Sequence, residues 1–241
     1  MCGRFTSRTT GIDLAQWFGV DEIVARDLGQ RYNIAPTDDT YAVAESGGHR
    51  RLGTFRWGLV PFWAKDLKVG AKMINARAEG LLDSTAFRRS FERRRCIIPA
   101  DGFYEWEHIS GKRKKQPWYI TRADGAPMAF AGLWDSWRPP EARDGNPDDA
   151  DQRVRSCTII TGPPNERIAS LHDRMPVVLP PDAWDAWLDR DNDDVASLQG
   201  LLVPAPAELF ELTPVSTAVN TVTNDGPELI EPVEPVSDTL L

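Results

Sequence analysis

The sequence predicts an α+β fold: a single domain built on a curled, mainly antiparallel, barrel-like β-sheet with short helices at its periphery. Short runs of alternating apolar and polar residues outnumber helical patterns along the 241 residues. The helical patterns are not regularly interleaved with these runs, as they would be in a parallel sheet of βαβ units. The hydrophobic content of 41% is ordinary for a globular protein, and the chain is long enough to bury a large core.

The first 60 residues predict one short helix and two strands. The helix is expected over 12–18, where Leu14 and Trp17 share one face. Alternating patterns predict strands at 40–44 and 52–59.

An arginine-rich helix is expected after Ser84, whose hydroxyl can accept hydrogen bonds from the first backbone amides of the helix. Phe87 and Phe91, four residues apart, then face the core. The arginines of this segment point outward, and we interpret them as a solvated helix face, with contact to DNA as the alternative: Arg88, Arg89, Arg93 and Arg94.

The rest of the chain predicts a succession of strands, at 96–99, 102–106, 117–122, 128–134 and 156–161. The basic stretch 111–115 is expected to be a turn. The segment 138–155, rich in Pro, Asp and Gly, is expected to form an acidic surface loop within a domain that spans 1–232. The Pro- and Glu-rich end, 233–241, is expected to be a tail.

Two more helices are expected in the last hundred residues. Asn165 is suited to cap one that ends at Leu171. Pro181 is suited to the first position of another, which continues through Leu188.

Charge is distributed unevenly along the chain, whose formal net charge is −8. Residues 1–140 carry 22 Lys and Arg against 16 Asp and Glu, whereas residues 141–241 carry 6 against 20. The two parts therefore have net charges of +6 and −14. Because phosphate binding depends on the local potential, this split predicts a basic working surface and an acidic remainder.

Several classes of protein are disfavoured by what the sequence lacks. No run approaches the roughly 18 apolar residues of a membrane span, and no export signal opens the chain. There is no nucleotide-binding glycine motif, so no nucleotide cofactor is expected. Three cysteines without a CxxC pair predict neither a disulfide framework nor a metal site. We expect a reduced cytoplasmic protein, a monomer without cofactors.

The opening MCGRF places Cys2 directly behind the initiator methionine. Removal of Met1 would leave an α-amine and a thiol on adjacent carbons of one residue. The amine can condense with an aldehyde to a Schiff base, and the thiol can then close on the same carbon to form a thiazolidine ring. An α-amine suits the first step, because its ordinary pKa of about 7.7–8.0 leaves a neutral fraction at pH 7.

Four further motifs accompany MCGRF: RWGLVPFW at 56–63, NARAE at 75–79, GFYEWE at 102–107 and HDRMPVVL at 172–179. Together the five closely resemble the SRAP (SOS response-associated peptidase) family. The resemblance implies binding of single-stranded DNA and a covalent crosslink between Cys2 and the aldehyde of an abasic site, which shields the lesion. It also implies autocatalytic, peptidase-type removal of Met1 and a place on the nucleoid when the protein is bound to DNA.

Three further residues are expected to act with Cys2. Glu105 lies among aromatic residues, which favours its neutral form and suits it to donate a proton; the resemblance implies that role for it. His172 suits proton transfer near neutral pH. Asn75 can donate and accept, so it suits a contact with the Cys2 amine or a sugar hydroxyl.

DNA contacts are expected from basic and aromatic residues near these motifs. Arg4 and Arg77 are the first candidates for phosphate contacts, followed by Arg56 and Arg174. Trp63 offers a flat face for stacking of unpaired bases. Trp57 lies in an alternating strand, so we assign it instead to the core.

Two alternatives remain open at this point. A glutamine amidotransferase with an N-terminal nucleophile also begins Cys-Gly, although its other motifs are missing here. A non-catalytic module that binds single-stranded DNA would need only the basic part of the chain.

Overall fold

The computed structural model of the chain describes residues 2–107, 115–142 and 152–235. The α-helices of this part are α1 (Gly11–Trp17), α2 (Arg88–Arg93), α3 (Trp184–Leu188) and α4 (Val195–Gly200), and several short 3-10 helices accompany them. Its strands are β1 (Phe5–Ser7), β2 (Glu22–Ile23), β3 (Arg31–Ile34), β4 (Asp39–Ser46), β5 (His49–Trp57), β6 (Asn75–Arg77), β7 (Arg95–Ala100), β8 (Gly102–Glu107), β9 (Gln116–Arg122), β10 (Met128–Trp137), β11 (Val154–Gly162), β12 (Met175–Pro176) and β13 (Phe210–Pro214).

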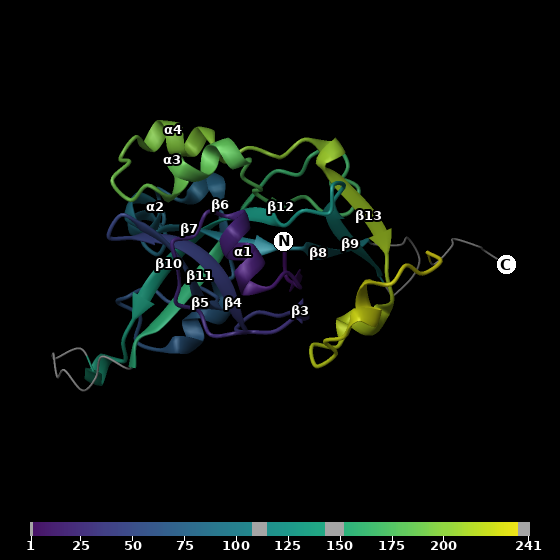
Figure 1. Cartoon of the computed structure of the whole chain (residues 1–241), viewed down its shortest axis with the longest axis horizontal. Helices are drawn as coiled ribbons and strands as arrows, with labels where there is room; N and C mark the ends of the chain where they lie inside the picture. The colour runs from purple at the N-terminus through teal and green to yellow at the C-terminus, as the bar shows by residue number, and fades with distance from the viewer. Residues whose placement is uncertain (1, 108–114, 143–151, 236–241) are drawn as a thin grey trace.

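A closed barrel forms one side of the molecule (Figure 1). Strands β11, β10, β7, β4 and β5 pair in that order, all antiparallel, and β11 then pairs with β5 in parallel. This last pairing, Ser156 with Arg56 and Cys157 with Trp57, closes the ring. Closure removes the exposed edges that an open sheet of these strands would have.

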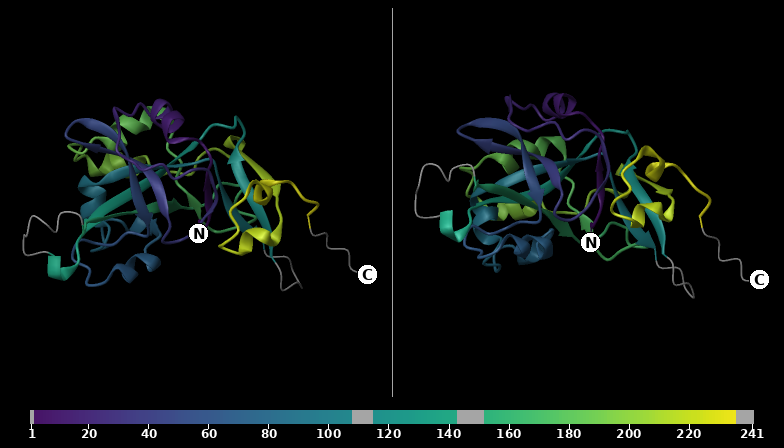
Figure 2. Two further views of the ribbon diagram at one scale, coloured as in Figure 1. Left: turned by 60° about the horizontal axis from the view of Figure 1, so that its bottom comes forward. Right: turned by 90° about the horizontal axis from the view of Figure 1, so that it is seen from below.

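A second sheet lies beside the barrel, with the order β13-β9-β8-β1-β3 (Figures 1 and 2). Aromatic side chains join the two units. Phe5 of β1 contacts Trp57 of the barrel edge-on at 4.9 Å between ring centroids, and Phe103 of β8 contacts Phe130 of β10 at 5.9 Å. One end of the barrel is thus covered by the second sheet.

Alternation along the strands divides the core in two. Ala42, Ile98 and Phe130 belong to the cluster that fills the barrel and continues into the second sheet. Their neighbours Val43 and Ile97 belong to the cluster on the outer face. Helices α1, α2, α3 and α4 supply apolar side chains to that outer cluster, so the helices are peripheral.

The fold class predicted from the sequence is confirmed, and so are most of its long strands. The strand expected at 52–59 is β5, which instead begins at His49 and ends at Trp57, where Gly58 turns the chain with a φ of +122°. Several short elements had no pattern strong enough to predict them: β1, β2, β3, β6, β12, β13 and α4.

Two helix predictions were wrong in detail. Ser84 does not cap α2: a turn follows it, and the helix begins at Arg88 behind Phe87, which makes no side-chain cap. The segment from Asn165 to Leu171 forms successive turns instead of a helix. The Asn165 side chain does accept the predicted amide hydrogen bond, from Ile168 at 3.0 Å.

Some sequence predictions concern residues outside the described part. They are most of the turn at 111–115, half of the acidic loop at 138–155, and the end of the tail at 233–241. The last two residues predicted for that loop belong to β11, which begins at Val154. Within the described residues, no helix is both long and apolar enough to span a membrane.

Candidate functional site at the amino terminus

Cys2 lies just ahead of β1, and its side chain belongs to the apolar cluster that fills the barrel and continues into the second sheet. Phe5 pairs with Phe103 of β8, and the Tyr104 amide donates to the Arg4 carbonyl at 3.0 Å. Continuing this antiparallel register brings the segment before Arg4 alongside Glu105. The short strand β1 therefore holds the start of the chain against the glutamate.

Asn75 fixes Cys2 from the barrel side. It begins β6, which pairs in parallel with β11 through Asn75 and Ile159. Its side-chain amide donates to the Cys2 carbonyl at 2.8 Å. Its Oδ1 is buried and accepts no hydrogen bond from the described residues, so an acceptor is left available next to Cys2.

Glu105 is a buried carboxyl, only 3% exposed. Burial raises its pKa to about 7; the positive charges of the amino terminus and Lys115 oppose this rise, and the negative charge of Asp173 adds to it. Near neutral pH the group therefore exists in both protonation states, as a general acid must. This agrees with the environment expected from its aromatic neighbours.

The Cys2 thiol is fully buried and points back toward the Arg4 carbonyl, 3.9 Å away. Burial raises its pKa well above the ordinary value, and the Glu105 charge adds to this. The sulfur is therefore a neutral thiol in this setting, and a nearby neutral amine would be the stronger nucleophile.

His172 lies in the segment that leads into β12, and it is partly exposed. β12 pairs with β11 at Thr161 and Gly162, and β6 pairs with β11 from Ile159 to Thr161, so both strands meet β11 at Thr161. The His172 Nδ1 accepts the Arg174 amide at 3.0 Å and lies 2.8 Å from the Asp173 carboxylate. The amide contact requires an unprotonated Nδ1 and the carboxylate contact requires a proton on Nδ1, so the protonation state of the ring selects between the two.

The four candidate phosphate ligands lie in different surroundings. Arg77, at the end of β6, is exposed. Arg4 is half-buried, and its Nη1 donates to Asn33 Oδ1 and the Val219 carbonyl, both at 2.9 Å. Arg56 and Arg174 are also engaged: Arg56 Nη1 donates to the Thr37 carbonyl at 2.8 Å, and Arg174 forms a two-point ion pair with Glu79.

Trp63 is 46% exposed, so its ring is accessible, as a stacking role requires. Its neighbour Phe62 is 43% exposed and lies under the Arg89 guanidinium at 4.3 Å. Trp57 is fully buried and donates to the Ile74 carbonyl at 2.9 Å, which confirms its assignment to the core.

Sequence reasoning missed two features of this region. Asp173 acts on the Glu105 carboxyl through its charge, although 68 positions separate them, and nothing local indicates this. The Arg174–Glu79 ion pair holds the pKa of Glu79 at about 2. The arginine in HDRMP and the glutamate in NARAE have the opposite charges that an ion pair needs. Only the hydrogen bonding of β6 and β12 to β11 brings these two segments together.

The described residues contain no cluster of His, Cys, Asp or Glu that could hold a metal ion. The arrangement instead brings together a thiol, an acceptor amide and a carboxyl that titrates near neutral pH. Such a set suits the addition of an amine and then a thiol to a carbonyl carbon, with proton transfer by the carboxyl.

Comparison with known proteins gives consistent matches. The family of SOS response associated peptidases (SRAP) matches residues 1–222. The abasic site processing protein YoqW of Bacillus subtilis is 44% identical over 232 residues, which cover 96% of this chain and 99% of that protein. The abasic site processing protein YedK of Escherichia coli is 32% identical over 240 residues, covering 97% and 100%. A solved protein structure from Bacteroides thetaiotaomicron has a TM-score of 0.81 at 21% identity, covering 97% of this chain and all of that one.

Proposed function

The chain belongs to the SRAP family, and on that premise we propose that it captures abasic sites in single-stranded DNA through a covalent bond to Cys2. The observation that carries this proposal is the placement of Cys2 between the Asn75 amide and the buried Glu105 carboxyl. The relatives' shared description, abasic site processing, supports the choice of substrate.

The reaction starts with removal of Met1, which frees the Cys2 amine. Self-cleavage fits the peptidase name of the family, and we assign Glu105 to assist it because its charge acts on Cys2. Because the mature amine belongs to the residue held by Asn75, cleavage and capture would occur at one place. No proteolysis of other proteins is proposed.

The neutral amine then attacks C1′ of the ring-opened sugar, and the carbinolamine loses its hydroxyl as water to give an imine. Protonated Glu105 supplies the proton that makes water the leaving group. The thiol next adds across the C=N bond: sulfur bonds to carbon and its proton passes to nitrogen. The net change is one thiazolidine formed and one water released, with no oxidant required.

Ring closure has a protective consequence. An imine at an abasic site hydrolyses readily and promotes elimination of the neighbouring phosphate. The thiazolidine contains no imine, so both reactions stop. Since amine and thiol belong to one residue, closure is intramolecular and proceeds at a high effective concentration.

Asn75 and His172 have supporting roles in this scheme. The buried Oδ1 of Asn75 is suited to accept a hydrogen bond from the amine or from a hydroxyl of the open sugar. His172 is suited to relay a proton during imine formation or ring opening. We place the protein in the cytoplasm as a monomer, on the nucleoid when bound, with its working domain over 1–232.

Intact mass measurement tests the proposal directly. Purified protein should lack Met1, and incubation with single-stranded DNA carrying an abasic site should give a heat-stable adduct. Cys2→Ala should bind DNA but give no stable adduct. Both Cys2→Ala and Cys2→Ser retain the α-amine but lack the thiol, so an imine is the only covalent product expected, and borohydride should trap it. A stable adduct with Cys2→Ala, or Met1 retained on most molecules, would overturn the mechanism.

Two rival functions make different predictions. A glutamine amidotransferase would release ammonia from glutamine, which this protein should not do. A non-catalytic binding module would give only complexes that dissociate in high salt, without an adduct that survives denaturation.

A further inference from the structure

The end of the barrel away from the second sheet carries a group of arginines around a tryptophan. Every second residue of each barrel strand faces the interior, as Ala44, Phe55 and Cys157 do. Extending the same alternation toward the far end leads to Ser46 on β4, Trp134 and Ser136 on β10, and Arg155 on β11. These residues therefore form the rim of an open barrel mouth, a usual place for a ligand.

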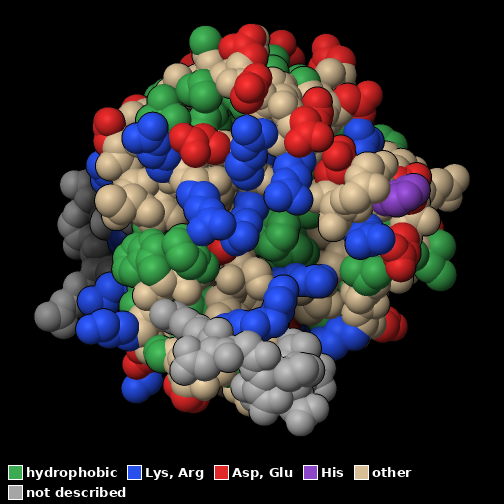
Figure 3. Space-filling view, turned by 90° about the vertical axis from the view of Figure 1, so that its left-hand side faces the viewer, with side chains coloured by type: hydrophobic (Ala, Val, Ile, Leu, Met, Phe, Trp, Pro, Cys, Tyr) green, Lys and Arg blue, Asp and Glu red, His purple; other side chains and the backbone are tan. Residues whose placement is uncertain are grey.

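The mouth is hollowed. A cavity of about 540 Å³ is lined by Arg94, Arg153, Arg155, Trp134, Thr54 and Ser136, among others. A smaller apolar cavity adjoins it, and the two share Trp134 and Arg155. Figure 3 views this end of the molecule and shows basic side chains gathered across its middle. The size of the larger cavity is that of a site for a small ligand or a nucleotide unit.

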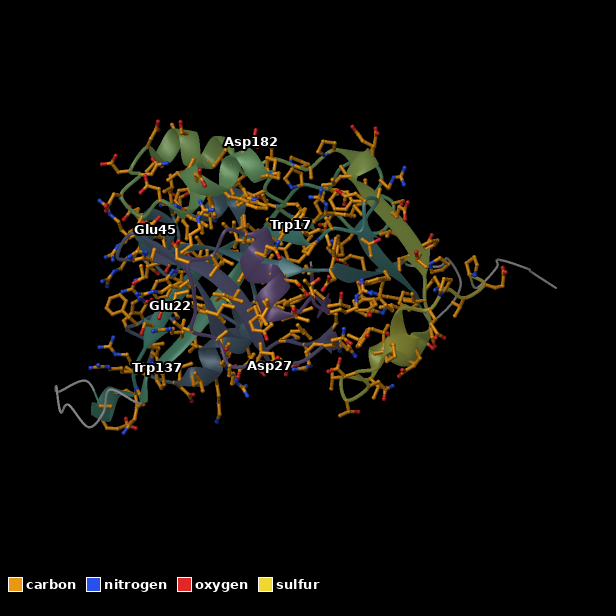
Figure 4. All side chains as sticks on the ribbon, in the orientation of Figure 1. Trp17, Glu22, Asp27, Glu45, Trp137 and Asp182 are labelled. Atoms are coloured by element: carbon orange, nitrogen blue, oxygen red, sulfur yellow. The ribbon has the colours of Figure 1, made fainter. Side chains whose placement is uncertain are left out.

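The charges at the mouth are only partly compensated. Arg94 forms an ion pair with buried Asp135, and Arg51 pairs with Glu22 at 2.8 Å. Glu45 lines the apolar cavity; Figure 4 labels Glu45 and Glu22 at this end of the molecule. Arg153 and Arg155, in contrast, are exposed, and no carboxylate of the described residues forms an ion pair with either.

The lining residues match the chemistry of a nucleic-acid strand. Arginine forks bind phosphate oxygens with two hydrogen bonds. Hydroxyls such as those of Thr54 and Ser136 can donate to phosphate or sugar. Trp134 is half-buried and lines both cavities, so its accessible part provides an aromatic wall of the kind that holds unpaired bases. The Arg94 guanidinium lies 5.4 Å from its ring centroid.

We propose that this barrel mouth is a second contact for single-stranded DNA, which binds the strand beyond the abasic site. The inference rests on the proposed function, because that function supplies the strand. Arg155 lies four residues along β11 from Ile159, the partner of Asn75, which corresponds to about 13 Å. A strand held at Cys2 would reach the mouth within a few nucleotides.

The test uses lesion-free single strands, so that it does not depend on Cys2 chemistry. The double variant Arg153→Gln/Arg155→Gln is compared with Arg26→Gln/Arg122→Gln, which removes the same total charge from two ion-paired arginines elsewhere in the molecule. Noncovalent affinity is measured against salt by fluorescence anisotropy, for strands of about 4 and about 16 nucleotides. Thermal melting of both variants checks that they remain folded.

For the longer strand, the first variant should bind more weakly and show a log–log salt slope shallower by about 1.4, or about 0.7 for each phosphate that is no longer neutralised. The control should change the slope little, and the adduct rate at saturating DNA should stay at the wild-type value. Equal slopes for the two variants would overturn the proposal. So would binding of a nucleoside monophosphate at the mouth as tight as that of the long strand. Failure of adduct formation by the wild type, in contrast, would count against the proposed function alone.

Discussion

Glu105 and the Cys2 thiol are both buried, and burial makes the carboxyl a better proton donor at neutral pH but the thiol a poorer nucleophile. Burial raises both pKa values, because each charged form is an anion. For the carboxyl, a pKa of about 7 produces a proton donor at neutral pH. For the thiol, the shift removes the thiolate, which leaves the first attack to the amine. The order of steps proposed above follows from this one difference.

Glu105→Gln should slow adduct formation by about 10²- to 10⁴-fold at pH 6, because the amide cannot donate the required proton. Above its pKa of about 7 the wild-type carboxyl is increasingly ionised, so the ratio of wild-type to variant rates should shrink with rising pH. Single-turnover gel assays across pH give this ratio. Glu107→Gln, on the same strand, is the matched control; a ratio that stays constant with pH would contradict the donor role.

The same pKa predicts how stability depends on pH. Folding raises the pKa of Glu105 from 4.5 to about 7, so between these values the folded state holds a proton that the unfolded state has lost. This contribution is present in full below about pH 4.5 and is lost as pH rises to 7, by about 3 kcal/mol. Glu105→Gln carries no ionisable group, so its melting temperature relative to wild type should rise over this range. A difference independent of pH would show that the carboxyl is not buried as described.

At the scale of elements, three short strands position the site: β1 follows Cys2, β6 carries Asn75, and β12 follows His172. β6 and β12 each pair with β11, a long barrel strand. The site thus depends on strands of two or three residues, which are held in place by pairing with the longer strands β8 and β11.

Asn75 tests this arrangement, because a substitution can remove the amide that donates to Cys2 and still keep a side-chain oxygen. Asn75→Asp retains an oxygen beside Cys2 but loses the donor to the Cys2 carbonyl. We expect both Asn75→Asp and Asn75→Ala to slow adduct formation, by about 10²-fold, since a displacement of 1 Å has that effect. Noncovalent affinity for DNA should remain within a few-fold. Full adduct rate in Asn75→Asp would show that the donor does not position Cys2.

Two glycines allow the segments before β6 to approach each other. Gly58 has a φ of +122°, and a Cβ there would lie 2.5 Å from the Gly70 carbonyl oxygen. Gly58→Ala should therefore destabilise the fold by more than the about 1–3 kcal/mol expected for backbone strain alone. Gly200→Ala is the control, because a Cβ there meets nothing within 4 Å. Chemical denaturation measures both; equal midpoints would refute the close approach.

How well the sequence predicted an element depended on the length of that element. The long strands have enough alternating residues to be recognised, and the residues of the site lie in motifs that resemble a known family. β1, β3 and β6 have three or four residues each, too few for a periodic signal. Their existence depends on pairing with distant strands, as in Phe5 with Ile34. Contacts such as Arg174 with Glu79 depend on that pairing and were equally inaccessible.

At the scale of the whole molecule, the chain has a negative net charge but also has basic surfaces. The net charge is −8, yet the first 140 residues are basic, and the arginine-lined mouth of the barrel draws on β5, β10 and β11 together. A strand of DNA responds to this local potential and not to the sum. Affinity for DNA should therefore be steeply dependent on salt despite the acidic composition.

Single substitutions test the DNA contacts proposed near Cys2. Arg77 is exposed and Arg174 is held by Glu79, so Arg77→Ala should flatten the log–log salt slope by about 0.7, whereas Arg174→Ala should change it less. Trp63→Ala should weaken binding with little change in slope, since stacking releases few ions. Arg4→Ala is a poorer probe, because it also removes the hydrogen bonds to Asn33 and Val219.

Intact duplex should compete weakly, because an abasic sugar must leave the helix to reach buried Cys2. Tight duplex binding, or a slope unaffected by Arg77→Ala, would show that the strand follows another path across the molecule.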